Sequence, residues 1–119
     1  MSRIALFAAG LLATLALAAP LGAATSVTKL TGTVGPGFTI TLKKGTAKVK
    51  TLKAGTYKIA VSDKSSIHDF HLKGPGVNKI ITTTPFKGSK TVTVKLKKGK
   101  YTYVCDPHAS VMKGSFTVK

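Results

Sequence analysis

The side chains with the clearest chemical capacity gather near the end of the 119-residue chain. Cys105, His108 and Met112 place a thiol, an imidazole and a thioether within eight residues. Soft sulfur ligands combined with imidazole favour copper, and two histidines with one cysteine in a plane, plus a weak axial methionine, form a blue-copper site. The segment therefore predicts a metal-binding loop that needs one more histidine.

Two histidines upstream compete for that place, His68 and His71. Residues three apart in a strand face opposite sides, so only one of the two points inward. His68 shares its parity with the apolar Phe70 and Leu72. We therefore predict His68 as the inward-facing ligand and expect His71 to face solvent.

Each of these residues also has an ordinary interpretation. A single cysteine on a strand is typical of an inert buried thiol. Met112 fits plain core packing, and His108 fits a surface loop. The short spacing between Cys105, His108 and Met112 favours a metal site over three separate explanations.

The elements that must position these side chains are short strands. After the first 24 residues no helical period appears, and apolar and polar residues alternate between glycine and lysine turns. Seven or eight such runs predict an all-β antiparallel sandwich with one solvated face on each sheet. The runs cover residues 27–34, 38–42, 47–49, 57–62, 67–72, 91–97, 101–105 and 116–119.

Residues 1–24 have the features of a secretory signal peptide. Arg3 is followed by the apolar run Ile4–Ala19, then by Pro20 and small residues. We expect cleavage after Ala24, which leaves one domain at residues 25–119 of an exported protein. The alternative is an uncleaved anchor, although a transmembrane helix needs roughly 20 apolar residues. An exported chain with one cysteine forms no internal disulfide, so its thiol is reactive, paired between chains or bound to a metal.

The charge of the chain is strongly unbalanced. It contains 19 Lys plus Arg against three acids, and Arg3 is its only arginine. Such a surface attracts acidic proteins or polyanions. Specific nucleic-acid binding is disfavoured because arginine is the residue that recognises phosphates and bases with two parallel hydrogen bonds.

From Phe38 to Lys119 the chain resembles the cupredoxins of the plastocyanin, amicyanin and pseudoazurin type. The resemblance rests on Cys105-Asp106-Pro107-His108, on Met112 before the last strand, and on the upstream pair His68-Asp69. It implies a Greek-key β-sandwich that binds one type 1 copper ion, Cu(I) or Cu(II). The implied ligands are His68, Cys105, His108 and Met112.

Two positions depart from that family pattern. Three residues separate His108 from Met112, whereas plastocyanin-like loops have four and amicyanin-like loops have two. Asp69 stands where the family usually has asparagine. In the family, that asparagine ties the loop of the first histidine to the residue after the cysteine. Here that residue is Asp106, so we expect two carboxyl groups to approach each other, and either they diverge or one keeps a proton.

The resemblance implies a monomeric carrier of single electrons between redox proteins, and not an enzyme. His108 would be the electron port, with an apolar docking patch from Val111, Pro75 and Phe86 and a rim of steering lysines. The alternative is a periplasmic or cell-surface protein that delivers copper, which methionine-rich tracts would support. Only Met112 follows the signal, so electron transfer is favoured, and the intact ligand spacing argues against a metal-free polyanion binder.

Overall fold

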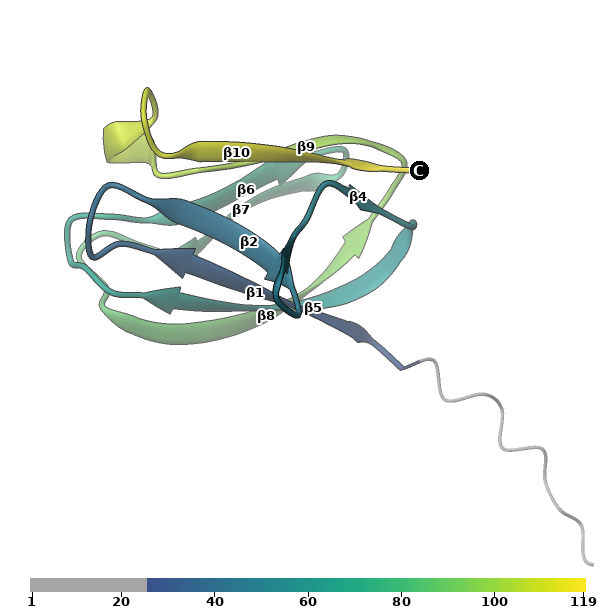
Figure 1. Ribbon diagram of the computed structural model, residues 1–119, viewed down its shortest axis with the longest axis horizontal. Coiled ribbons are helices and arrows are strands. Elements are labelled where there is room, and N and C mark those ends of the chain that lie inside the picture. The colour runs from purple at the N-terminus through teal and green to yellow at the C-terminus, as the bar shows by residue number, and fades with distance from the viewer. Residues whose placement is uncertain (1–25) are drawn as a thin grey trace, which may run out of the picture.

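The computed structural model describes residues 26–119, which form two five-stranded β-sheets packed face to face (Figure 1). The predicted signal peptide lies outside the described residues. One sheet has the order β3-β2-β1-β5-β8 and the other β4-β10-β9-β6-β7. The strands are β1 (Thr28–Val34), β2 (Ile40–Lys44), β3 (Ala47–Lys48), β4 (Thr51–Leu52), β5 (Gly55–Asp63), β6 (Phe70–Gly74), β7 (Val77–Thr82), β8 (Gly88–Leu96), β9 (Gly99–Val104) and β10 (Lys113–Val118).

The prediction of a β-sandwich is confirmed, but the prediction that it is wholly antiparallel is wrong. β1 pairs with β5 in parallel, and so does β4 with β10. A parallel pair needs a crossover connection, and the segment containing β2, β3 and β4 supplies it between β1 and β5. Eight of the ten strands have five or more residues, and β3 and β4 have two each. Seven of the expected runs correspond to long strands, and the run expected at residues 47–49 corresponds to the short β3.

One of the longer strands, β7, was not predicted from the sequence. Only its last two residues, Ile81 and Thr82, are buried, so its apolar and polar residues do not alternate. β7 is the edge strand of its sheet, next to β6 alone. A strand with one neighbour and little buried surface carries a weak hydrophobic period.

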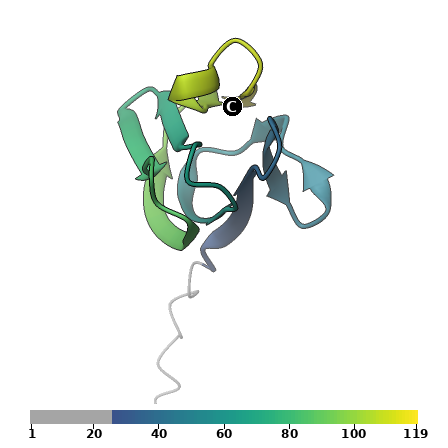
Figure 2. The ribbon, with the colours of Figure 1, turned by 90° about the vertical axis from the view of Figure 1, so that its left-hand side faces the viewer.

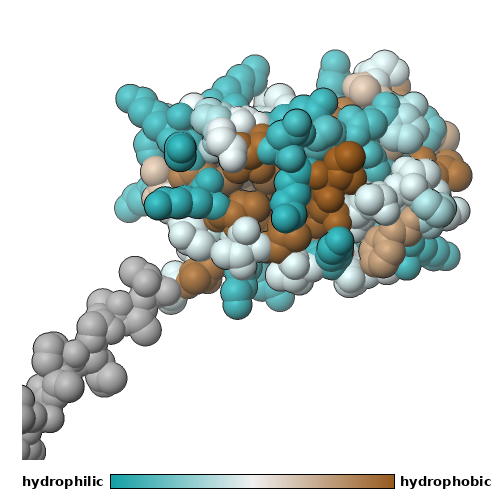
Figure 3. All heavy atoms as spheres, turned by 180° about the vertical axis from the view of Figure 1, so that it is seen from behind, coloured by the Kyte–Doolittle hydropathy of each residue, from teal (hydrophilic) through white to brown (hydrophobic). Residues whose placement is uncertain are grey.

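The core lies between the sheets and follows the predicted alternation. In β5, Tyr57, Ile59 and Val61 are buried while Lys58 is exposed. Outward-facing polar side chains project around an apolar strip on the rear face (Figure 3). Burial of the inward residues holds the register, because a shift by one residue would turn the apolar set to solvent.

Stacked aromatic rings in the core help to fix β9, the strand that leads into Cys105. The ring of Tyr103 stacks on Phe70 with centroids 5.7 Å apart. On the neighbouring strand β10, Gly114 pairs with Tyr103, and a Cβ there would lie 2.2 Å from the Tyr103 Cζ. The tyrosine ring therefore occupies the space that a side chain at Gly114 would take.

Four loops meet at one end of the sandwich, which we call the site end (Figures 1 and 2). They are residues 35–39, 64–69, 83–87 and 105–112. The opposite end, the far end, carries the remaining turns, the start of β1 and the end of β10. Within residues 26–119 there is no helix long and apolar enough to cross a membrane.

Candidate metal centre

The loop between β9 and β10 brings Cys105 and His108 together. The Cys105 N–H donates to the Met112 carbonyl at 3.0 Å, which closes the loop at its base. A 3-10 turn, Asp106–His108, begins directly after Cys105, and the His108 N–H donates to the Cys105 carbonyl at 3.0 Å. This turn places His108 Nδ1 3.6 Å from Cys105 Sγ.

His68 approaches the same point from the loop between β5 and β6. Its side chain is fully buried. Its Nδ1 lies 3.6 Å from Cys105 Sγ and 3.1 Å from His108 Nδ1. The structure thus brings His68, and not His71, together with Cys105 and His108, and their donor atoms all lie within 4.8 Å of one another.

The spacing of these three donor atoms fits a single metal ion. A circle through His68 Nδ1, His108 Nδ1 and Cys105 Sγ, with sides of 3.1, 3.6 and 3.6 Å, has a radius of about 2.0 Å. Imidazole and thiolate bonds to a first-row metal such as zinc are about 2.0–2.3 Å long. Burial raises the pKa of the Cys105 thiol, whereas a bound cation favours the thiolate. The spacing of the three donor atoms is therefore the feature that suits one bound cation.

Met112 lies in the same loop, fully buried. Its N–H donates to the His108 carbonyl at 2.9 Å, and the Val111 N–H donates to the same oxygen at 3.1 Å. The three residues between His108 and Met112 thus form one tight turn. That turn returns the methionine side chain to the protein interior.

Two residues of the loop between β1 and β2 complete the surroundings of the histidines. Phe38 is 59% exposed, and its ring packs edge-on against His108 and His68 with centroids 4.9 and 5.6 Å away. Gly35 has a φ of +71°, and a Cβ there would lie 2.9 Å from His68 Cδ2. Neither contact was predicted, and the only signal in the sequence was the Gly35-Pro36-Gly37 turn itself.

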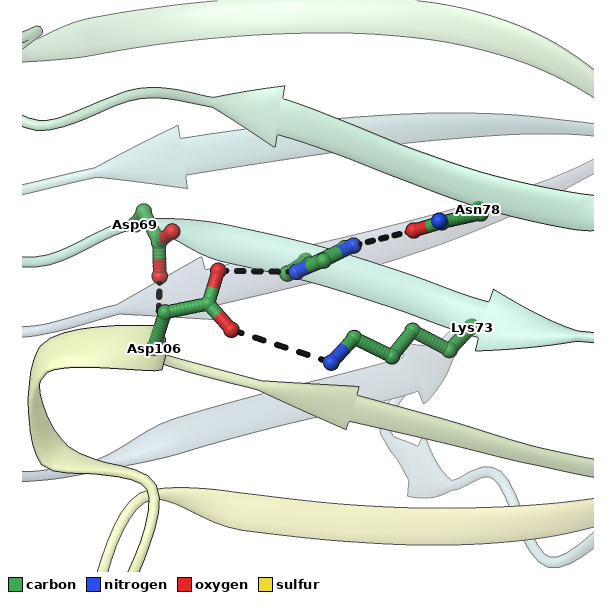
Figure 4. A network of polar contacts seen from close by, with 5 residues as sticks. Asp69, Lys73, Asn78 and Asp106 are labelled. Atoms are coloured by element: carbon green, nitrogen blue, oxygen red, sulfur yellow. Dashed lines mark hydrogen bonds and ion pairs between the residues drawn. The ribbon is translucent and has the colours of Figure 1, made fainter.

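Asp69 joins the two ligand loops. Its Oδ1 accepts the Asp106 backbone N–H at 2.7 Å (Figure 4). Burial, followed by the side-chain contact with Asp106 and the charge of Asp106, raises the pKa of Asp69 to about 6, although the backbone hydrogen bond from Asp106 acts to lower it. The expected approach of two carboxyl groups is therefore found, and Asp69 is the one that keeps its proton longer.

The Asp106 side chain turns away from the site towards β6. Its Oδ2 lies 2.7 Å from His71 Nδ1, and its Oδ1 lies 3.9 Å from Lys73 Nζ (Figure 4). His71 Nε2 also contacts the side-chain oxygen of Asn78. Burial alone would raise the pKa of Asp106, but its hydrogen bonds with Asp69 and His71 and the charge of Lys73 lower it. His71 thus lies outside the donor cluster, but its side chain is only 12% exposed and is tied to the residue after Cys105, so the expected solvent-facing position is only partly found.

The predicted docking patch is only partly found at the site. Val111 and Phe86 are exposed in loops of the site end. Pro75 lies instead in the turn between β6 and β7 at the far end, where its carbonyl accepts the Tyr101 hydroxyl at 2.8 Å. Including Pro75 was wrong, because a position near a strand end does not reveal which end of the sandwich the strand points to.

Comparison with known proteins agrees with this geometry. Residues 34–119 match the family described as copper binding proteins of the plastocyanin/azurin family. The chain therefore belongs to this copper-binding family. The arrangement of His68, Cys105, His108 and Met112 fits a type 1 copper site, and electron transfer is the activity that fits the family.

Solved structures show the same fold. Rusticyanin, a copper protein, is 23% identical with a TM-score of 0.55, over 76% of each chain. Reduced rusticyanin is 26% identical with a TM-score of 0.51, over 76% of this chain and 78% of the other. A chain of a heme-copper terminal oxidase dimer is 21% identical with a TM-score of 0.54, over 76% of this chain and 63% of the other. A search of curated protein sequences gives no match.

Proposed function

We propose that the protein is an exported carrier of single electrons whose one copper ion is bound by His68, Cys105, His108 and Met112. The observation that carries this proposal is the triangle of two imidazole nitrogens and one thiol sulfur, 3.1 to 3.6 Å apart, in which His68 and Cys105 are fully buried and His108 is half-buried. Copper supplies a one-electron Cu(I)/Cu(II) couple when bound by such ligands.

The chain's own contribution is to hold its donors in place. The Cys105 to Met112 hydrogen bond closes one loop, and the Asp69 to Asp106 hydrogen bond ties it to the loop of His68. Donors that are fixed before an electron arrives move little when it does, which lowers the barrier to transfer. Since His68, Cys105 and Met112 are fully buried, the proposed site has no open position for a substrate, and we propose no enzymatic activity.

The surface around His108 supports docking of a redox partner. His108 is half-buried, while His68 is fully buried, so His108 is the histidine nearer to solvent. Phe38, Ile67 and Val111 are exposed apolar residues of the site-end loops. This patch gives a redox partner an apolar contact over the proposed electron port. We propose that the carrier acts as a monomer.

Titration of the metal-free protein with Cu(II) tests the proposal. We expect an intense visible charge-transfer band, because a short bond between copper and the Cys105 thiolate produces it. Cys105→Ser should abolish the band, since a hydroxyl does not replace the thiolate. His68→Ala or His108→Ala should open a position to added imidazole and shift the spectrum.

His71→Ala is the matched control for His68→Ala, because both remove an imidazole from the same segment. We expect it to retain the band. Copper binding without a band, or a band that survives Cys105→Ser, would show that the site is not of type 1. A band lost in His71→Ala and kept in His68→Ala would move the ligand assignment to His71.

A further inference from the structure

The positive charge of the domain is concentrated at the end opposite the metal centre. Ten exposed lysines lie on the strand ends and turns of the far end. The site-end loops and the strand residues that border them carry three lysines and all three aspartates of the chain. The ten are Lys43, Lys44, Lys48, Lys50, Lys53, Lys95, Lys97, Lys98, Lys100 and Lys119; the site-end residues are Lys64, Lys87, Lys113, Asp63, Asp69 and Asp106. The other five lysines, Lys29, Lys58, Lys73, Lys79 and Lys90, lie within strands and belong to neither group.

The far-end lysines have no acidic partner within residues 26–119. Among all lysines of residues 26–119, Lys73 alone lies within ion-pair distance of a carboxylate, with its Nζ 3.9 Å from Asp106 Oδ1. The site end is close to neutral, because its lysines and aspartates balance. The excess of lysine over aspartate is therefore larger at the far end than in the site-end loops, and an anionic surface would attract the far end first.

The far end also has a hollow among its lysines, in which apolar Val27, Leu52 and Tyr57 lie between serine and threonine side chains. The hollow has a volume of about 880 Å³, with Val27 and Leu52 in its lining together with Lys44, Lys53 and Lys119. Apolar surface rimmed by lysines suits the boundary between lipid headgroups and acyl chains, because lysine extends its ammonium group outward while its stem covers apolar surface. A rigid polyanion such as nucleic acid would leave this hollow unused.

The path of the chain also favours a lipid membrane as the partner of the far end. β1 begins at the far end with Thr28, and only residues 20–27 separate it from the apolar run Ile4–Ala19. Eight extended residues span at most about 28 Å. On the proposed export of the chain, the far end would therefore emerge next to the membrane, where anionic headgroups attract lysines near the surface.

We propose that the far end is a docking surface for a bilayer that contains anionic lipids. The domain would lie with its lysines on the headgroups and its site end turned towards the aqueous phase. A redox partner would then reach His108 without displacing the protein from the membrane. This inference rests on the charge distribution and holds whether or not copper is bound.

Sedimentation of the exported protein with lipid vesicles tests the proposal. Vesicles of phosphatidylcholine with phosphatidylglycerol are compared with vesicles of phosphatidylcholine alone, at two salt concentrations. We expect binding to the anionic vesicles only, weakened by salt. The comparison with neutral vesicles removes any contribution from an apolar segment left at the N-terminus.

Two triple variants with the same change in net charge locate the surface. Lys53, Lys98 and Lys119 are replaced by glutamine in one, and Lys64, Lys87 and Lys113 in the other. Each lysine near an anionic bilayer contributes about a five-fold factor, so the far-end variant should lose about a hundred-fold in partitioning. The site-end variant should lose only a few-fold, and the copper spectrum of both checks that they fold.

Several results would overturn the proposal. Equal losses in the two variants would show that net charge alone acts. Equal binding to neutral and anionic vesicles would show that the lysines do not drive association. Binding to an acidic protein or to DNA under conditions where anionic vesicles are not bound would assign the far end to another partner.

Discussion

Replacement of Gly114 by alanine tests how the core holds the strand that delivers Cys105. An added Cβ would lie 2.2 Å from Tyr103 Cζ and 2.3 Å from its hydroxyl oxygen. Carbon atoms in contact are normally about 3.5–4.0 Å apart, so ring or strand would have to move by more than an ångström. The Tyr103 ring has little room to do so, because it is fully buried and stacked on Phe70 and Phe116.

We therefore expect Gly114→Ala to destabilise the metal-free protein by about 2–3 kcal/mol, at the upper end of the cost of overpacking a core. For a domain of this size that corresponds to a fall of roughly 10–20 °C in Tm. Urea unfolding followed by tyrosine fluorescence or circular dichroism measures the change. The copper spectrum should shift as well, since Tyr103 lies two residues before Cys105.

Gly37→Ala is the matched control. No atom lies within 4 Å of a Cβ at Gly37, and its φ is not one that favours glycine. It should leave stability unchanged or raise it by about 0.4–1 kcal/mol, because alanine has less freedom in the unfolded chain. A Gly114→Ala protein within 0.5 kcal/mol of Gly37→Ala would refute the claim that Tyr103 is held rigidly against β10.

Three further predictions concern the site and the export of the chain. In the metal-free protein the pKa of Asp69 is raised from 3.8 to about 6, so the folded state binds the Asp69 proton more tightly than the unfolded chain does. The free energy of unfolding should therefore fall as pH rises from about 4 to 6. Urea titrations at several pH values measure this fall, and Asp69→Asn should remove it. Met112→Leu should keep the visible band and raise the reduction potential, because a weak thioether ligand helps to stabilise Cu(II), and an unchanged potential in voltammetry would argue against an axial Met112. Intact mass of the protein from the native envelope or medium should show an N-terminus after Ala24, and a chain that still begins at Met1 would contradict cleavage.

The local pattern of the sequence was sufficient to predict the class of fold and the ligand loop. Inward and outward residues alternate in strands such as β5 because each strand buries one face. The parity argument for His68 over His71 agrees with the geometry, since Phe70 and Leu72 are fully buried and His68 lies inside with them. Cys105, His108 and Met112 are close in the chain, so a single short loop suffices to bring them together.

The local pattern of the sequence did not predict features that depend on contacts between distant segments. The parallel pairing of β1 with β5 follows from a crossover whose path no single strand encodes. The wrong placement of Pro75 has the same origin, as does the failure to anticipate Phe38 against the histidines.

The sequence by itself determined the donor types, their spacing, the alternation of the strands and the excess of lysine. Each of these depends on neighbouring residues and on composition alone. Only the tertiary structure decided that the two histidine nitrogens and the Cys105 sulfur converge within 3.6 Å, and that Asp69 bridges to Asp106. It also decided that the lysines gather opposite the site, because the end of the sandwich at which a turn lies is set by how all the strands pair and pack together.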